Sequence, residues 1–149
     1  MDYAALAIAT WGVGYLPLMP GTFGSLVGIA VFLLLKWWPI QVAATVLITF
    51  TGIWAGSRTE RILRLKDPGR VVVDEVAGQM IALLPLSVFA ASSLTWIIVS
   101  FILFRLFDIF KPYPARRLEA LPSGLGIMMD DVLAGAYAAV IVAVILVLR

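Results

Sequence analysis

The sequence FRLFDIFKPYPARRLEALPSGLGIMMDD, residues 104–131, concentrates charge between two apolar stretches. The 29 residues before Arg105 carry no charge, and neither does the segment 132–148. The charged residues of this stretch that are best suited to chemistry are Arg105, Asp108, Lys111, Arg116, Arg117, Asp130 and Asp131. The pattern predicts an apolar scaffold that holds polar groups at one place.

Composition indicates an integral membrane protein. A length of 149 residues predicts one domain, residues 1–149. The hydrophobic content of 62% and the mean hydropathy of +1.05 exceed those of soluble globular proteins. The formal net charge of +2 is small, and the charged residues occur in clusters. This pattern is typical of residues that orient a protein in a membrane and does not indicate nucleic-acid binding. A very apolar soluble bundle is the alternative.

The absence of two residue types limits the chemistry. The chain has no cysteine and no histidine, which excludes disulfides, thiolate nucleophiles and Cys/His zinc sites. It also excludes the commonest general base at neutral pH. Catalysis would therefore use carboxylates, hydroxyls, Lys, Arg or a hard metal ion. The N-terminus lacks the basic region and cleavage pattern of a signal peptide.

Apolar runs and turn signals predict an all-α membrane bundle of about five short helices after an N-terminal interfacial helix at 2–11. The Pro- and Gly-rich stretch 17–25 is expected to be irregular. Two helices are expected over about 24–35 and 40–56, and the second continues as a basic segment, 58–64. Close helix packing is expected at two small-residue pairs, Gly24/Gly28 and Gly52/Gly56.

The uncharged run 76–104 is too long for one span, because a helix of that length would measure about 43 Å against roughly 30 Å of hydrocarbon. Pro85 and the Ser92-Ser93 pair predict two helices joined by a hairpin near 87–94. Nine of the eleven basic residues then share one side of the membrane. The positive-inside rule makes that side cytoplasmic.

The same topology brings five carboxylates to the cytoplasmic side: Asp74, Glu75, Asp108, Asp130 and Asp131. The adjacent acids are expected to lie in the first turns of two helices, the second of which begins near 128–131. There they would complement the helix dipole, which is a purely structural explanation. Unpaired, however, so many acids would repel one another, and a divalent cation would relieve this repulsion. Oxygen-only ligands favour Mg²⁺.

Cations and hydroxyls on the same side are suited to phosphate. Thr22 and Ser25 lie where a helix is expected to start, at which free N–H groups favour an anion, although simple capping is the alternative. Arg105, Asp108 and Lys111 share one helix face, where a surface salt bridge with snorkelling cations is the alternative. The residues therefore predict a metal-dependent site for a phosphate-bearing lipid.

Four segments together resemble the phosphatidylglycerophosphatase A family, in order and in spacing. They are PGTFGS (20–25), VDEVAGQ (73–79), FRLFDIFKPYPARRLE (104–119) and GIMMDDVLAG (126–135). Tyr113 departs from the pattern, since the family often has Trp there. The resemblance implies an Mg²⁺-dependent enzyme of the bacterial inner membrane, with its active site facing the cytoplasm. Its substrate would be phosphatidylglycerol phosphate, which it converts to phosphatidylglycerol.

For that reaction, the five carboxylates are expected to hold one or two Mg²⁺ ions and to activate water. Asp74, Asp108 and Asp130 are the expected catalytic acids, with Asp74 or Asp130 as the group that accepts the proton of water. The residues expected to bind phosphate oxygens are Thr22, Ser25, Arg105 and Lys111.

Two other functions are the alternatives, and the sequence fails to match the pattern of the first. The first is a CDP-alcohol phosphotransferase, whose pattern is echoed by Ala115-Arg116 and Asp130. Lys111 and Ala134 stand at two of the acid positions which that pattern requires. The second is a non-enzymatic membrane scaffold, in which the acids are caps and the basic residues are topology signals.

Overall fold

The computed structural model describes residues 2–149, and every regular element in that range is helical. The elements are α1 (Tyr3–Thr10), the 3₁₀ turn η1 (Val13–Tyr15), α2 (Pro20–Leu34), α3 (Trp38–Leu63), α4 (Val73–Val88), α5 (Leu94–Phe110), α6 (Ala115–Leu118) and α7 (Gly124–Leu148). The all-α prediction is confirmed. The expectation that all the helices are short is wrong for α3 and α7, which have 26 and 25 residues.

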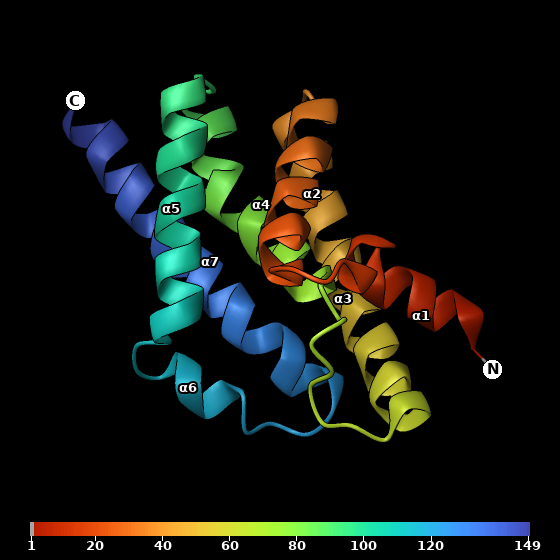
Figure 1. Ribbon diagram of the computed structural model, residues 1–149. Helices are drawn as coiled ribbons and strands as arrows, with labels where there is room; N and C mark the ends of the chain where they lie inside the picture. Colours follow the sequence, from red (N-terminus) through yellow and green to blue (C-terminus); the bar gives the residue numbers. More distant parts are fainter. Residues whose placement is uncertain (1) are drawn as a thin grey trace.

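The central helix is α4, which packs against α2, α3, α5 and α7 (Figure 1). Eleven of its 16 residues are buried. Leu83 and Leu86 form one core cluster with Phe32 of α2 and Val142 of α7. Burial of this helix on several sides orders its neighbours around it, because each of them buries its own apolar stripe against α4.

A very close approach between two helices joins α4 to α7 through two glycines. A Cβ atom built on Gly135 would lie 2.3 Å from the carbonyl oxygen of Gly78, and one built on Gly78 would lie 2.7 Å from the carbonyl oxygen of Asp131. Asp74 precedes Gly78 by four residues, and Asp131 precedes Gly135 by four, so each acid lies one turn before its glycine on the same helix face. The contact therefore brings the two carboxylates together.

The two predicted glycine pairs also form close contacts, which confirms their packing role. On α2, Cβ atoms at Gly24 and Gly28 would lie 3.0 Å and 2.8 Å from carbonyl oxygens at the start of α4. On α3, a Cβ at Gly52 would lie 2.6 Å from the sulfur of Met128, and one at Gly56 would lie 3.4 Å from the backbone of α7. These positions let α2 approach the start of α4 and let α3 approach the start of α7.

The helix directions confirm the predicted hairpin, since α4 and α5 are joined by the short segment 89–93. Figure 1 shows this turn at the opposite end of the molecule from the segments 64–72 and 111–123. Nine basic residues belong to the end that holds these two longer segments, and only Lys36 and Arg149 belong to the other. Pro85 was expected to interrupt the chain, but α4 continues through it to Val88.

Two helices begin earlier than predicted. Helix α2 starts at Pro20, within the stretch expected to be irregular, because a first-turn proline has no N–H group to satisfy and its φ suits a helix. Helix α7 starts at Gly124, whose N–H donates to Oγ of Ser57 on α3 at 3.0 Å. Asp130 and Asp131 are therefore the seventh and eighth residues of α7, and the expectation that they lie in its first turn is wrong.

Helices α3 and α7 are long and apolar enough to cross a membrane, although length and composition alone do not separate a span from a buried core helix. Helices α2, α4 and α5, with 15, 16 and 17 residues, would measure about 22–26 Å. That is shorter than the roughly 30 Å of a bilayer's hydrocarbon core. Large apolar side chains are exposed on the outer faces of the bundle, including Leu47, Phe50 and Ile109.

Substitution of Gly135 by alanine is expected to lower the free energy of unfolding by about 1–3 kcal/mol, because the added methyl group would collide with the backbone of α4. Thermal unfolding of the detergent-purified protein measures this loss as a lower Tm. Gly69→Ala is the matched control, since a Cβ at Gly69 meets nothing within 4 Å. Equal Tm values for the two variants would contradict the close α4–α7 contact.

Candidate active site

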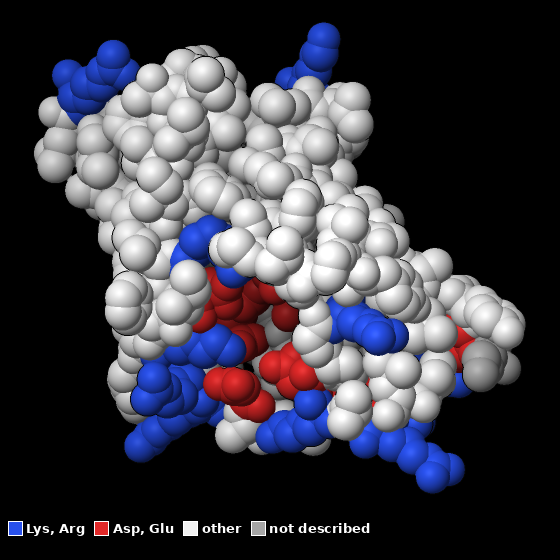
Figure 2. All heavy atoms as spheres, in the orientation of Figure 1, with Lys and Arg blue, Asp and Glu red and all other residues white. Residues whose placement is uncertain are grey.

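Three carboxylates from α4 and α7 meet in the interior of the bundle. One oxygen each of Asp74, Glu75 and Asp131 lies within 4.8 Å of the other two. Asp74 and Asp131 are buried, with 8% and 3% of their surface exposed. Figure 2 shows acidic side chains gathered in a hollow whose rim carries basic side chains. Acids at this depth need compensating charge.

The donor atoms of these acids fit a hard cation. Oδ1 of Asp74, Oε2 of Glu75 and Oδ2 of Asp131 are buried and have no hydrogen-bond partner. A buried charged oxygen without a partner is costly, and three of them at one point make a strongly negative site. Oxygen ligands of this kind are those that Mg²⁺ and Ca²⁺ prefer. The three residues are thus suited to hold a divalent cation.

Asp108 and Arg105 form an ion pair beside this group. Nη1 of Arg105 lies 2.6 Å from Oδ2 of Asp108, and both side chains are largely buried. Asp108 is also close enough for its charge to interact with those of Glu75 and Asp131. A Cβ built on Gly21 would lie 2.3 Å from Oε1 of Glu75 and 3.2 Å from two guanidinium nitrogens of Arg105. The start of α2 therefore lies against the site.

Lys111 forms the second ion pair, with Asp130. Nζ of Lys111 donates to Oδ2 of Asp130 at 2.6 Å and lies 3.5 Å from a carboxylate oxygen of Glu119. Burial by itself lowers the pKa of Lys111. The hydrogen bond to Asp130 and the negative charges of Asp130 and Glu119 outweigh it and raise this pKa above its usual value. Lys111 is therefore charged at neutral pH.

The two hydroxyls expected at the site differ in their placement. Thr22 is half-buried in the first turn of α2, next to Gly21. Ser25 is fully buried, and its Oγ donates to the carbonyl oxygen of Gly21 at 3.1 Å. Neither hydroxyl caps the helix, so the simple capping alternative is wrong for both.

Comparison with known proteins shows to which family the chain belongs. The model of the family described as Phosphatidylglycerophosphatase A matches residues 7–146. The chain belongs to the phosphatidylglycerophosphatase A family. This confirms the predicted resemblance, and it favours a phosphatase over the CDP-alcohol phosphotransferase and the non-enzymatic scaffold. No solved structure is detectably similar to the chain.

Three relatives are similar over most of their length. A protein of Bacteroides thetaiotaomicron named "Putative phosphatidylinositol-3-phosphatase" is 43% identical over 142 residues, covering 90% of this chain and 87% of the relative. Proteins named phosphatidylglycerophosphatase A are 38% identical in Haemophilus influenzae and 33% identical in Escherichia coli. These two alignments cover 89% and 87% of this chain, and 82% and 75% of the relatives.

Two polar residues of this phosphatidylglycerophosphatase A family member stand out in the structure and were not singled out by sequence reasoning. Gln79 follows Glu75 by one turn and is fully buried, and neither atom of its amide group has a hydrogen-bond partner. The spacing of four residues puts Gln79 on the same face of α4 as Glu75, and this spacing can be read from the sequence. Asp67, in the segment between α3 and α4, is the second of these residues. With Lys66, Arg116 and Glu119, it lines an open pocket of about 470 Å³.

The Lys111–Asp130 pair is expected to stabilise the fold, because removal of either partner leaves the other charge partly buried and unpaired. Lys111→Met, Asp130→Asn and the double variant form a cycle that isolates the pair. Its coupling free energy is expected to be about 1–3 kcal/mol, measured by chemical unfolding in detergent. If the double variant loses the sum of the two single losses in unfolding free energy, to within about 0.5 kcal/mol, the pair does not stabilise the fold.

Proposed function

We propose that the protein is a Mg²⁺-dependent phosphatase that hydrolyses the terminal phosphate monoester of phosphatidylglycerol phosphate, giving phosphatidylglycerol and inorganic phosphate. Membership of the phosphatidylglycerophosphatase A family supports the reaction. The observation that carries the mechanism is the group of three buried carboxylate oxygens without partners, with two ion-paired cations beside it.

In this proposal Asp74, Glu75 and Asp131 hold the cation directly. Asp108 and Asp130 lie at the edge of the same group and complete the five expected ligands. When bound, Mg²⁺ would supply positive charge to the phosphoryl oxygens and lower the pKa of a water molecule. The buried position of Asp74 and Asp131 excludes bulk water, which strengthens every charge interaction with the substrate.

Arg105 and Lys111 would bind the phosphate oxygens. Each is already oriented by a carboxylate, Asp108 for Arg105 and Asp130 for Lys111. A guanidinium group and an ammonium group aimed at one phosphate stabilise the charge that develops as the phosphorus–oxygen bond breaks. Thr22, beside the Arg105 contact at Gly21, would add a hydroxyl donor, and Ser25 would support this turn of α2 from within.

A carboxylate would take the proton of the attacking water. Water oxygen forms the new bond to phosphorus, the bond to the glycerol oxygen breaks, and that oxygen receives a proton. Asp74 and Asp130 are the two candidates for the proton acceptor. Oδ1 of Asp74 would hold the cation, which leaves only the second oxygen of Asp74 for the proton, whereas Oδ2 of Asp130 is engaged by Lys111. A move of Lys111 toward the phosphate would free Asp130 to act.

The same proposal places the chain in the bacterial inner membrane as a multi-pass protein. Two helices are long and apolar enough to cross a membrane, and large apolar side chains are exposed on the outer faces of the bundle. Both features support a lipid environment. Nine of eleven basic residues lie at the carboxylate end, so the positive-inside rule puts this end in the cytoplasm. The lipid headgroup would enter the hollow from that side.

A second substrate is worth testing because of the Bacteroides relative. Phosphatidylinositol 3-phosphate, like phosphatidylglycerol phosphate, carries a terminal phosphate monoester beyond the phosphodiester of a phospholipid. The proposed cation site and the two cations would bind either monoester. The relative's 43% identity makes this lipid the second candidate.

Phosphate release by the detergent-purified protein tests the proposal. Wild type is expected to release phosphate from phosphatidylglycerol phosphate with Mg²⁺ and not with EDTA. Asp74→Asn and Asp131→Asn are each expected to lower kcat/KM at least about 100-fold, because each removes a ligand of the charge-stabilising ion.

Asp2→Asn is the control for these variants, since Asp2 forms a solvent-exposed pair with Arg58 and lies outside the site. It is expected to retain activity within about twofold. Release that is unaffected by EDTA and by both substitutions would overturn the metal-dependent mechanism. Faster phosphate release from phosphatidylinositol 3-phosphate than from phosphatidylglycerol phosphate would make phosphatidylinositol 3-phosphate the preferred substrate.

A further inference from the structure

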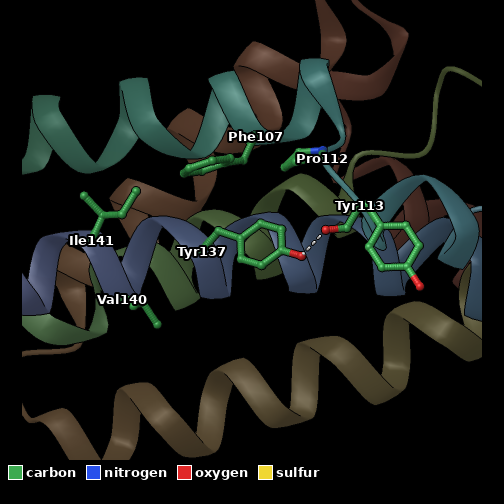
Figure 3. Close-up of a pocket in the computed structure, with 6 residues that line it drawn as sticks. All are labelled: Phe107, Pro112, Tyr113, Tyr137, Val140 and Ile141. Atoms are coloured by element: carbon green, nitrogen blue, oxygen red, sulfur yellow. Dashed lines mark hydrogen bonds between the residues drawn. The ribbon is translucent and has the colours of Figure 1, made fainter.

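An apolar groove lies between α5 and α7 on the outside of the bundle (Figure 3). It encloses about 540 Å³ and is lined by Phe107, Pro112, Tyr113, Tyr137, Val140 and Ile141. The Phe107 and Tyr137 rings meet edge to face, with centroids 5.5 Å apart. The hydroxyl of Tyr137 donates to the carbonyl oxygen of Tyr113 at 3.0 Å, so this polar group of the wall already has a partner.

One end of this groove adjoins the charged site. Pro112 and Tyr113 directly follow Lys111, the residue that binds Asp130. On α7, Tyr137 follows Asp130 by seven residues, or two turns, so the two side chains lie on one helix face. The groove is therefore the apolar continuation of the surface that carries the Lys111–Asp130 pair.

Other apolar hollows on the described surface lack this connection. One of about 280 Å³ is lined by residues of α3 and α4, among them Val46 and Phe50, and by Val132 of α7. Its lining residues on α3, 42–50, stand at least eight positions before Arg58, the first charged residue of that helix. None of the lining residues of this hollow is charged, and none directly follows a cation in the sequence. Among the described hollows with a predominantly apolar lining, the α5–α7 groove is the one whose lining directly follows a cation, Lys111. The hollow that contains Lys36 also has polar lining residues, including Gln41 and Ser87.

We propose that the α5–α7 groove binds an acyl chain of the phospholipid substrate, with the headgroup at the Lys111 end. This inference rests on the proposed function and adds a binding site to it. An amphipathic lipid matches both parts of the surface: the chain covers Phe107, Tyr137 and Ile141, and the phosphates face Lys111. Burial of the chain would add binding free energy in proportion to the apolar area covered.

Hydrolysis of two substrates tests this groove. One is long-chain phosphatidylglycerol phosphate in mixed micelles, and the other is its deacylated headgroup, glycerophosphoglycerol phosphate, in the same micelles. Ile141→Trp fills the groove and is expected to lower the ratio of kcat/KM, long-chain to deacylated, about tenfold. Val46→Trp, in the α3–α4 hollow, is the matched control and is expected to leave this ratio unchanged.

Three results would contradict binding in the groove without contradicting the phosphatase activity. They are an unchanged kcat/KM ratio in Ile141→Trp, an equal loss of kcat/KM on both substrates, or an equal fall of the ratio in Val46→Trp. Wild type that hydrolyses neither substrate would contradict the proposed function instead. A binding measurement then still tests the groove.

That measurement uses phosphatidylglycerol with a photoreactive diazirine in one acyl chain. Labelled peptides are expected to come from α5 and α7 around Phe107 and Ile141, and Ile141→Trp is expected to lose this label. Labelling spread evenly over the apolar surface would overturn the groove.

Discussion

The close contact of Gly78 on α4 with Gly135 on α7 is the constraint on which the rest of the structure depends. No side chain larger than hydrogen fits between the two backbones. One turn before these glycines stand Asp74 and Asp131, so the crossing that buries the core also fixes the separation of two carboxylates. Packing and site geometry are thus set by one contact, and a change in the crossing alters both.

Because that contact buries two carboxylates side by side, it determines which charged residues lie around them. Buried carboxylates repel one another and lose hydration, so they require positive charge nearby. The chain supplies part of it through Arg105 and Lys111, which pair with Asp108 and Asp130. Asp74, Glu75 and Asp131 keep oxygens without partners, and this remaining negative charge suits a divalent cation and, through it, a phosphate group.

Much of this arrangement could be predicted from the sequence. The hairpin between α4 and α5 follows from the distribution of basic residues, and it brings the acidic segments to one end. The start of α7 could not be predicted, because Gly124 is held in a helix by Ser57 of α3, a contact absent from local sequence. The start of α2 has a local signal, since proline suits the first turn of a helix. Nor does periodicity tell which acids meet each other and which pair with Arg105 or Lys111, since that depends on helix rotation and side-chain reach.

The central claim is that the α4–α7 crossing creates a divalent-cation site, and binding of Mn²⁺ to the purified protein tests it most directly. Electron paramagnetic resonance measures free Mn²⁺ during a titration, and Mg²⁺ serves as the competitor. The account predicts saturable binding that Mg²⁺ displaces and that Asp131→Asn weakens at least about tenfold. Equal binding by wild type and by Asp131→Asn would contradict a cation held by these carboxylates.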